Sequence, residues 1–279
     1  MSPEPTPALL ASLSDRDRAI TESLRQFRLL STQQLRRLHF ADGHANPAAA
    51  TRATTRVLTR LEDGGVIARL NRRIGGARGG STSLIWQLGP AGERAVRALA
   101  GGKQRRRYVE PSGMFARHTI AVAELAVRLI EASRTGAAEL LRLDTEPACW
   151  RSFVAPTGAV EWLKPDLYVI TASSDFEDHA FVEVDLGTEH VTTVLRKARA
   201  YQRYRATGRH EADHGVFPAV TWVVPNGLRE GALTAAFGAD AALAGDLHRV
   251  TTADAALAAL GVPGVPGRDD ETPEPTEIT

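Results

Sequence analysis

One segment, Gly101–Gly113 (GGKQRRRYVEPSG), has the glycine, proline and charge content of an exposed linker. The regions on its two sides each have their own hydrophobic periodicity, and 279 residues are enough for two domains of ordinary size. We therefore expect a linker at 101–113 between a domain at 13–100 and a second domain at 114–261. Residues 1–12 and 262–279 are proline-rich with little to bury, so we expect disorder there, the second stretch forming an acidic tail.

The overall net charge of +1 hides two halves of opposite sign. Through His118 the chain has 20 Lys+Arg against 9 Asp+Glu, a net charge of +11. From Thr119 onward it has 14 against 24, a net charge of −10. A half this basic favours a polyanionic partner, which the total charge alone does not suggest.

Several classes of protein are excluded at this stage. A single cysteine, Cys149, can form neither an intramolecular disulfide nor a zinc-thiolate site. The N-terminus lacks the basic start and long apolar run of a signal peptide, and no stretch of 18 apolar residues exists. We expect a cytoplasmic protein of a prokaryote-like cell, with no membrane partner.

The first region predicts three helices followed by a β-hairpin. Ser14 and Ser31 are candidate N-caps, and Asn46-Pro47 combines a preferred N-cap with proline at the first helical position. The third of these helices ends at Gly64-Gly65. Two strand-like runs, 66–74 and 82–89, then flank a glycine-rich turn. This order is typical of a winged helix-turn-helix.

The basic residues of this region suit contact with double-stranded DNA. Arg52, Arg56 and Arg60 follow one another at intervals of four residues, which puts them in a single stripe on the third helix, with Thr55 beside them. The glycine-rich turn adds three further arginines that we expect at phosphates: Arg72, Arg73 and Arg78. The alternative is a solvated arginine face on a winged-helix module that serves dimerisation.

The second region predicts an α/β domain that carries clustered carboxylates. Asp166 follows a proline at the start of one strand, and Glu183 and Asp185 alternate on the next, so the latter two share a face. Clustered carboxylates are costly to bury without a cation between them, and oxygen-only ligands suit Mg²⁺ or Mn²⁺. On the following helix, Lys197 and Tyr201 lie at i and i+4 and share one face.

This arrangement resembles the PD-(D/E)xK nuclease-like (restriction-endonuclease-like) superfamily, whose core is a helix with an acid, a strand with Pro-Asp and a strand with Glu-x-Lys. The matching residues are Glu124, Asp166 and Glu183. The resemblance implies catalytic roles for them and for Lys197, with Mg²⁺ held by the carboxylates. The sequence departs from the pattern at Asp185, which stands where the family has lysine.

Five further segments form a pattern over nearly the whole chain: Leu58–Arg69, Arg117–Leu125, Lys164–Leu167, Phe181–Glu189 and Lys197–Tyr201. This pattern resembles the replication-relaxation (plasmid mobilisation accessory) family. The resemblance implies an α+β protein of two domains, a winged helix followed by the nuclease-like domain, that works with plasmid or mobile-element DNA in replication, transfer or their control. A relaxase or replication protein and a second copy of the chain are the partners it suggests.

Each carboxylate also has a purely structural interpretation. Asp166 and Glu183 would then pair with Lys197 or neighbouring arginines, Asp185 would be a structural acid, and Glu124 would lie beside an arginine of its own helix. Two classes of function are therefore open. The chain is a metal-dependent endonuclease or nickase targeted by its winged helix, or a non-catalytic DNA-binding accessory or regulatory protein whose nuclease-like domain serves dimerisation or partner docking.

Overall fold

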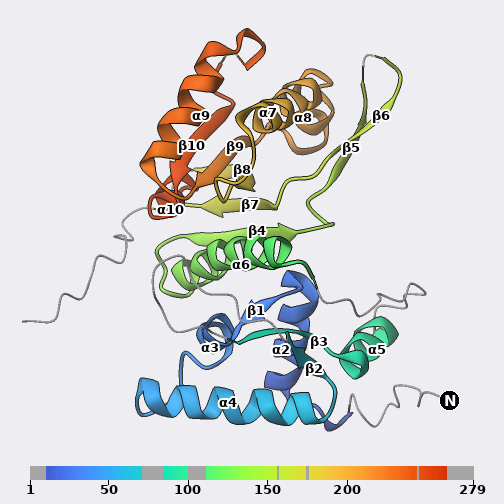
Figure 1. Cartoon of the computed structure of the whole chain (residues 1–279), viewed down its shortest axis with the longest axis vertical. Coiled ribbons are helices and arrows are strands. Elements are labelled where there is room, and N and C mark those ends of the chain that lie inside the picture. Colours follow the sequence, from blue (N-terminus) through green and yellow to red (C-terminus); the bar gives the residue numbers. More distant parts are fainter. Residues whose placement is uncertain are drawn as a thin grey trace, which may run out of the picture. The chain divides into compact units, whose positions relative to one another are not determined.

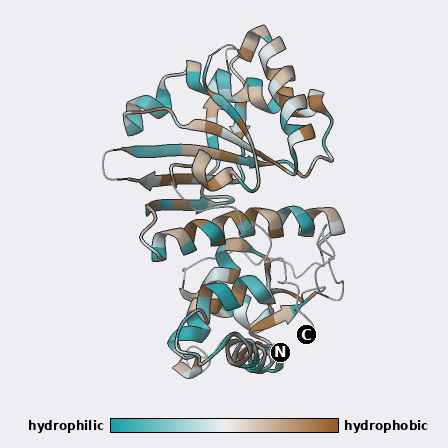
Figure 2. Ribbon diagram, turned by 90° about the vertical axis from the view of Figure 1, so that its left-hand side faces the viewer, coloured by the Kyte–Doolittle hydropathy of each residue, from teal (hydrophilic) through white to brown (hydrophobic). Residues whose placement is uncertain are grey.

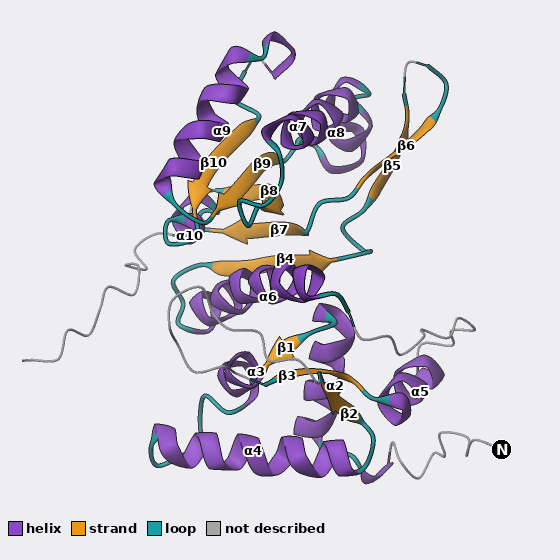
Figure 3. Cartoon of the chain, in the orientation of Figure 1, coloured by secondary structure: helices purple, strands orange, loops and turns teal. Residues whose placement is uncertain are grey.

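The computed structural model describes residues 11–70, 84–99, 111–155, 157–173, 176–243 and 245–262. Within these ranges the chain is an α+β protein with helices and mixed sheets (Figures 1 and 3). Two compact units are present. The first unit comprises Met1–Glu131 and Leu143–Tyr168, and the second comprises Ala132–Arg142 and Val169–Thr279. Each is described here by itself.

Three predicted segments lie wholly or mostly outside the described residues. They are the linker at 101–113, the N-terminal stretch 1–12 and the tail 262–279. The predicted domain boundary between 13–100 and 114–261 stays a prediction. Most of the helix that follows the predicted linker belongs to the first unit.

The first unit contains five helices among its described residues, together with a small antiparallel sheet and a separate hairpin. The three-stranded sheet has the order β1-β3-β2, and β5 pairs with β6 so that Val154 faces Val160 across the hairpin. In chain order the elements are α2 (Asp15–Phe27), β1 (Leu30–Ser31), α3 (Thr32–His39), α4 (Pro47–Asp63), β2 (Ile67–Arg69), β3 (Ile85–Leu88), α5 (Pro90–Leu99), α6 (Gly113–Arg134, to Glu131 in this unit), β5 (Arg151–Val154) and β6 (Val160–Leu163).

Local sequence signals explain where the first helices begin, and the structure confirms all three predicted starts. Ser14 accepts a hydrogen bond from the backbone of Asp17, whose side chain accepts one from the backbone of Ser14 in return. Ser31 and Gln34 form the same capping box at α3. Asn46 caps α4, with proline directly after it.

The core of the first unit is formed by the apolar faces of these helices against the small sheet. Ile20 and Leu24 of α2, Leu35 of α3 and Leu58 of α4 are almost completely buried, as is Trp86 of β3. Figure 2 shows the helices alternating between brown and teal, as expected where one face of a helix is buried and the other meets water.

The second unit is built on a larger sheet with the strand order β10-β9-β8-β7-β4. The pairs β8/β9 and β9/β10 are parallel, so each needs a crossover connection, which α7 with α8 and then α9 provide. The elements are β4 (Glu139–Thr145), β7 (Leu167–Ala172), β8 (Glu177–Val184), α7 (Val191–Ala206), α8 (Arg209–His214), β9 (Ala219–Val224), α9 (Gly227–Ala239), the 3-10 helix η1 (Ala241–Leu243), β10 (His248–Thr252) and α10 (Ala256–Ala259). The unit boundary cuts through β4 and β7.

The sheet of the second unit is buried where its strands run parallel. β8 is buried from Ala180 to Val184 and β9 from Val220 to Val224. Nearly continuous burial of this kind is expected of strands covered on both faces. Glu183 lies inside this run and faces Trp222 in register, so its carboxylate requires polar partners.

Helix α5 packs so closely on the chain before β2 that Gly92 cannot be replaced without movement. A Cβ at Gly92 would stand 2.1 Å from the carbonyl oxygen of Val66. We predict that Gly92→Ala lowers the free energy of unfolding by about 1–3 kcal/mol through overpacking. Gly231→Ala in α9, where a Cβ meets nothing within 4 Å, should instead be neutral or raise it by about 0.5–1 kcal/mol. Thermal and urea unfolding measure both, and equal effects would contradict the packing argument.

Candidate functional site

Helix α4 presents a polar face to solvent opposite its buried face. Arg52, Thr55, Arg56 and Arg60 are exposed, whereas Leu58 is fully buried. The predicted stripe therefore exists as a solvent-facing surface. The side chains of Arg52 and Arg56 make no ion pair or hydrogen bond with any residue in the described part of the chain.

The third arginine of this stripe differs from the other two, because Arg60 has a structural partner. Its Nη2 lies 2.6 Å from Oδ1 of Asp17, a carboxylate that is 2 % exposed and belongs to the α2 capping box. Burial alone would raise the pKa of the Asp17 carboxyl, but hydrogen bonds from Arg60 and Ser14 outweigh it and hold the pKa below its usual value. Arg60 thus ties α4 to the start of α2.

The three other predicted DNA contacts, Arg72, Arg73 and Arg78, lie outside the described residues. Their role stays a prediction.

In the second unit, Glu183 accepts a hydrogen bond from the helix that follows its strand. The hydroxyl of Tyr201 donates to Oε1 of Glu183 at 2.7 Å, in a buried environment. Lys197, one turn earlier on α7, places its Nζ 3.7 Å from Oε2 of Glu183 and 3.1 Å from Oε1 of Glu189. The shared face predicted for Lys197 and Tyr201 is therefore confirmed, and it is directed at Glu183.

Asp185, immediately after β8, is held on both of its oxygens. Oδ1 accepts the backbone N–H of Gly187 at 2.7 Å, and Oδ2 accepts the Nε–H of Arg229 at 2.7 Å. Arg229 also donates to the carbonyl oxygen of Glu189, which fixes the loop between β8 and α7. Gly187 has φ +76°, a conformation that favours glycine at this turn.

These contacts bear on the Mg²⁺ or Mn²⁺ predicted at Asp166, Glu183 and Asp185. Both oxygens of Asp185 are occupied by protein donors, and Glu183 already has a hydroxyl donor and a cation. Metal binding by Asp166, Glu183 and Asp185 stays a prediction. Among the described residues no group of three or more His, Cys, Asp or Glu side chains is placed to hold a metal ion.

Glu124, predicted as a catalytic acid, contacts helix α3 within the first unit. Its carboxylate accepts hydrogen bonds from Gln34, at 3.0 Å, and from Arg37. Arg37 pairs with Glu131 as well. Burial alone would lower the pKa of the Arg37 guanidinium, but Glu131 and Glu124 raise it above its ordinary value. The arrangement anchors α6 on α3.

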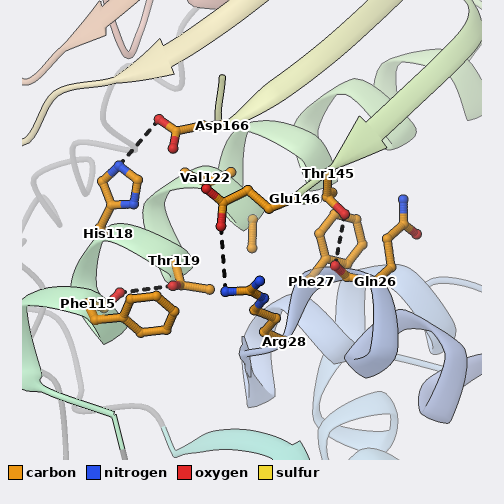
Figure 4. Close-up of a pocket in the computed structure, with 11 residues that line it drawn as sticks. Gln26, Phe27, Arg28, Phe115, His118, Thr119, Val122, Thr145, Glu146 and Asp166 are labelled. Carbon is orange, nitrogen blue, oxygen red and sulfur yellow. Dashed lines mark hydrogen bonds and ion pairs between the residues drawn. The ribbon is translucent and has the colours of Figure 1, made fainter. Parts of the chain in front are cut away.

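Asp166 belongs to the first unit, whereas Glu183 and Asp185 belong to the second, so the predicted joint site stays a prediction. Within the first unit, Oδ2 of Asp166 lies 3.3 Å from Nε2 of His118 on α6 (Figure 4). The pair lines a pocket of about 220 Å³. Arg28 and Glu146, which form an ion pair with N–O 3.5 Å, line the same pocket.

The described residues that line this pocket include an imidazole and two carboxylates, and Cys149 is not among them. The Asp166 carboxylate beside the His118 imidazole holds the orientation of the ring, and an imidazole is a side chain that can serve as a general acid or base. The thiol of Cys149, which donates to the carbonyl oxygen of Pro165, is buried. Burial raises the pKa of that thiol to about 12, which keeps it protonated and unreactive.

Sequence reasoning missed Arg229, the main partner of Asp185. A signal existed, because a cation in the first turn of a helix is unfavourable next to the positive end of the helix dipole and needs a nearby anion. It also missed Arg37 as the partner of Glu124, for which the sequence offered no local signal. Both partners are arginines far along the chain from the carboxylates that they neutralise.

The family model for replication-relaxation matches residues 22–220 of the chain. The chain belongs to the replication-relaxation family. The match confirms the resemblance drawn from the sequence motifs and includes α4, Asp166, Glu183, Asp185 and α7. No curated protein and no solved structure is significantly similar to the chain. Membership in the replication-relaxation family suggests a role in plasmid or mobile-element replication.

Every helix within the described ranges is too short or too polar to cross a lipid bilayer.

The contacts of Arg60 predict that it stabilises the fold, in contrast to its two neighbours on the stripe. Asp17 has a lowered pKa, so its stabilising contribution is full above the usual value of 3.8 and is lost as the pH falls through the folded-state pKa. Arg60→Ala should therefore destabilise the protein at pH 7 and move its acid-unfolding midpoint to higher pH. Circular dichroism from pH 7 to 2 measures this, with Arg52→Ala and Arg56→Ala as matched controls that should leave the midpoint in place. A midpoint unchanged by Arg60→Ala would contradict the pairing.

A second prediction concerns Asp185, whose side chain is only 4 % exposed. Removing its cation with Arg229→Ala leaves a buried charge uncompensated, which typically costs about 3–5 kcal/mol in the free energy of unfolding. Urea unfolding measures the loss, and Arg249→Ala, at an exposed arginine of β10, serves as the control with little effect. A loss below about 1 kcal/mol would show that Asp185 does not depend on Arg229.

Proposed function

We propose that the chain is a double-stranded-DNA-binding protein of plasmid or mobile-element replication or transfer, and that its second unit acts without cleaving DNA. Family membership supports the biological context. The exposed stripe on α4 supports the DNA contact.

A winged helix-turn-helix is the interpretation of the first unit that accounts for the order of its elements. Helix α2, strand β1, helices α3 and α4, and strands β2 and β3 follow one another, and the three strands pair in the order β1-β3-β2. In this interpretation α4 is the recognition helix. A helix of this kind enters the major groove with its exposed side chains directed at phosphates and base edges.

The observation that carries the proposal is the difference among the arginines of α4. Arg60 neutralises a buried carboxylate, whereas Arg52 and Arg56 have no such duty within the described residues. Both are exposed, with Thr55 and its hydroxyl between them. Exposed guanidinium groups at helical spacing are suited to phosphates and to guanine edges.

The non-catalytic role of the second unit is supported by the partners of its carboxylates. Lys197 and Arg229 are built-in cations for Glu183 and Asp185, so these acids are already neutralised. Endonuclease or nickase activity with Mg²⁺ or Mn²⁺ stays a prediction from the superfamily resemblance. A relaxase or replication protein and a second copy of the chain stay proposed partners for the second unit.

The proposal predicts salt-dependent binding to duplex DNA through α4. Each phosphate contact contributes about 0.9 to the slope of log K against log salt concentration, so Arg52→Ala with Arg56→Ala should lower that slope by about 1.8 and weaken binding. Fluorescence anisotropy with a labelled duplex, from 50 to about 300 mM salt, measures both quantities.

The control is Arg18→Ala with Arg25→Ala, which removes the same charge from α2, where both arginines pair with acids of their own helix. It should leave the slope unchanged. No binding by the wild-type protein would refute the proposed function. If both double variants lowered the slope equally, the loss would reflect the total charge of the protein and not a contact through α4.

A further inference from the structure

Helix α7 is basic along its whole length although it lies in the acidic half of the chain. Its 16 residues, Val191–Ala206, include no aspartate or glutamate. They include five cations: Arg196, Lys197, Arg199, Arg203 and Arg205. A helix with this imbalance lacks the alternating charges of an ordinary solvated face, which stabilise one another at i,i+4.

Three of these cations form a row on the side of α7 that faces away from the sheet. At 100° per residue, Arg196, Arg199 and Arg203 fall within about 60° of one another. We call this row the α7 arginine stripe. The buried residues of the helix lie on the opposite side: Val194, Ala198, Tyr201 and Tyr204. Arg196 and Arg199 are exposed, and Arg203 is half-buried.

The stripe is separate from the carboxylate cluster at Glu183. Lys197, one residue from Arg196, turns the other way and pairs with Glu183 and Glu189. Arg196 is exposed, and its side chain makes no ion pair or hydrogen bond with any residue of the described ranges. Arg199 donates through Nε to Asp240 at 2.8 Å, and its side chain is half exposed to solvent.

We infer that the α7 arginine stripe is a second DNA-contact surface, which binds the phosphate backbone of duplex DNA. The inference rests on the proposed function for its choice of polyanion. The stripe spans about 10 Å along the helix axis, and a duplex carries one phosphate charge per about 1.7 Å of its own axis, so several phosphates lie within reach of three guanidinium groups. The three arginines follow one another at i, i+3 and i+7, whereas those of α4 lie at i, i+4 and i+8, and they lie on the second unit.

A row of this kind supplies affinity and positioning without sequence specificity. Contacts to phosphates fix how a protein lies on the duplex, whereas base edges specify the sequence. The stripe is therefore expected to strengthen binding to every duplex alike.

The test uses the full chain and two duplexes of unrelated sequence in the anisotropy titration. Arg196→Ala with Arg203→Ala should lower the salt slope by about 1.8 on both duplexes. Arg205→Ala, on the opposite side of α7, is the matched control and should leave the slope as in the wild type. Thermal unfolding establishes that each variant is folded, and if the double variant is not, Arg196→Ala alone should lower the slope by about 0.9.

The outcomes separate this inference from the proposed function. One outcome is that the wild type binds, the α4 double variant lowers the slope and the stripe variants do not. The stripe is then not a DNA contact, and the proposed function stands. A loss confined to one of the two duplexes, or an equal loss in Arg205→Ala, also overturns the inference. A wild type that binds neither duplex overturns the proposed function itself.

Discussion

A carboxylate that is almost entirely removed from water requires a cation, and in the second unit Arg229 supplies it for Asp185. The arginine crosses from the first turn of α9 to the residue after β8 and also holds the backbone of the loop that leads into α7. For Glu183, Lys197 of α7 supplies the cation, and Tyr201 of the same helix donates a hydrogen bond. The carboxylates assigned to a nuclease-like centre from the sequence are therefore paired with the protein's own cations, which favours the non-catalytic interpretation that we propose.

The first unit uses the same principle. Arg60 neutralises Asp17 between α4 and α2, and Arg37 pairs with Glu124 and Glu131 between α3 and α6. Arginine suits such duties because its planar group remains charged when partly buried and can serve two acceptors at once. The arginines without such duties then stand out, namely Arg52 and Arg56 on α4 and Arg196 on α7. The account of DNA binding depends on this division between structural and available cations.

Local signals in the sequence were sufficient for much of the fold. Ser14, Ser31 and Asn46 mark helix starts because a capping side chain satisfies backbone groups within three residues, a range over which sequence alone determines geometry. Helical periodicity likewise placed Lys197 and Tyr201 on one face. The partners of the buried acids could not be found in this way. Arg229 lies 44 residues from Asp185 and Arg60 lies 43 from Asp17, so both pairings depend on how the elements pack.

The central claim, that the chain binds DNA while its carboxylates serve structure, is tested most directly with supercoiled plasmid. The protein is incubated with the plasmid in Mg²⁺ or Mn²⁺, and samples taken over time are run on a gel before and after the protein is removed. The account predicts a retarded complex that returns only supercoiled DNA once the protein is gone. Nicked or linear plasmid that forms with the wild type and is lost with Glu183→Gln would contradict it.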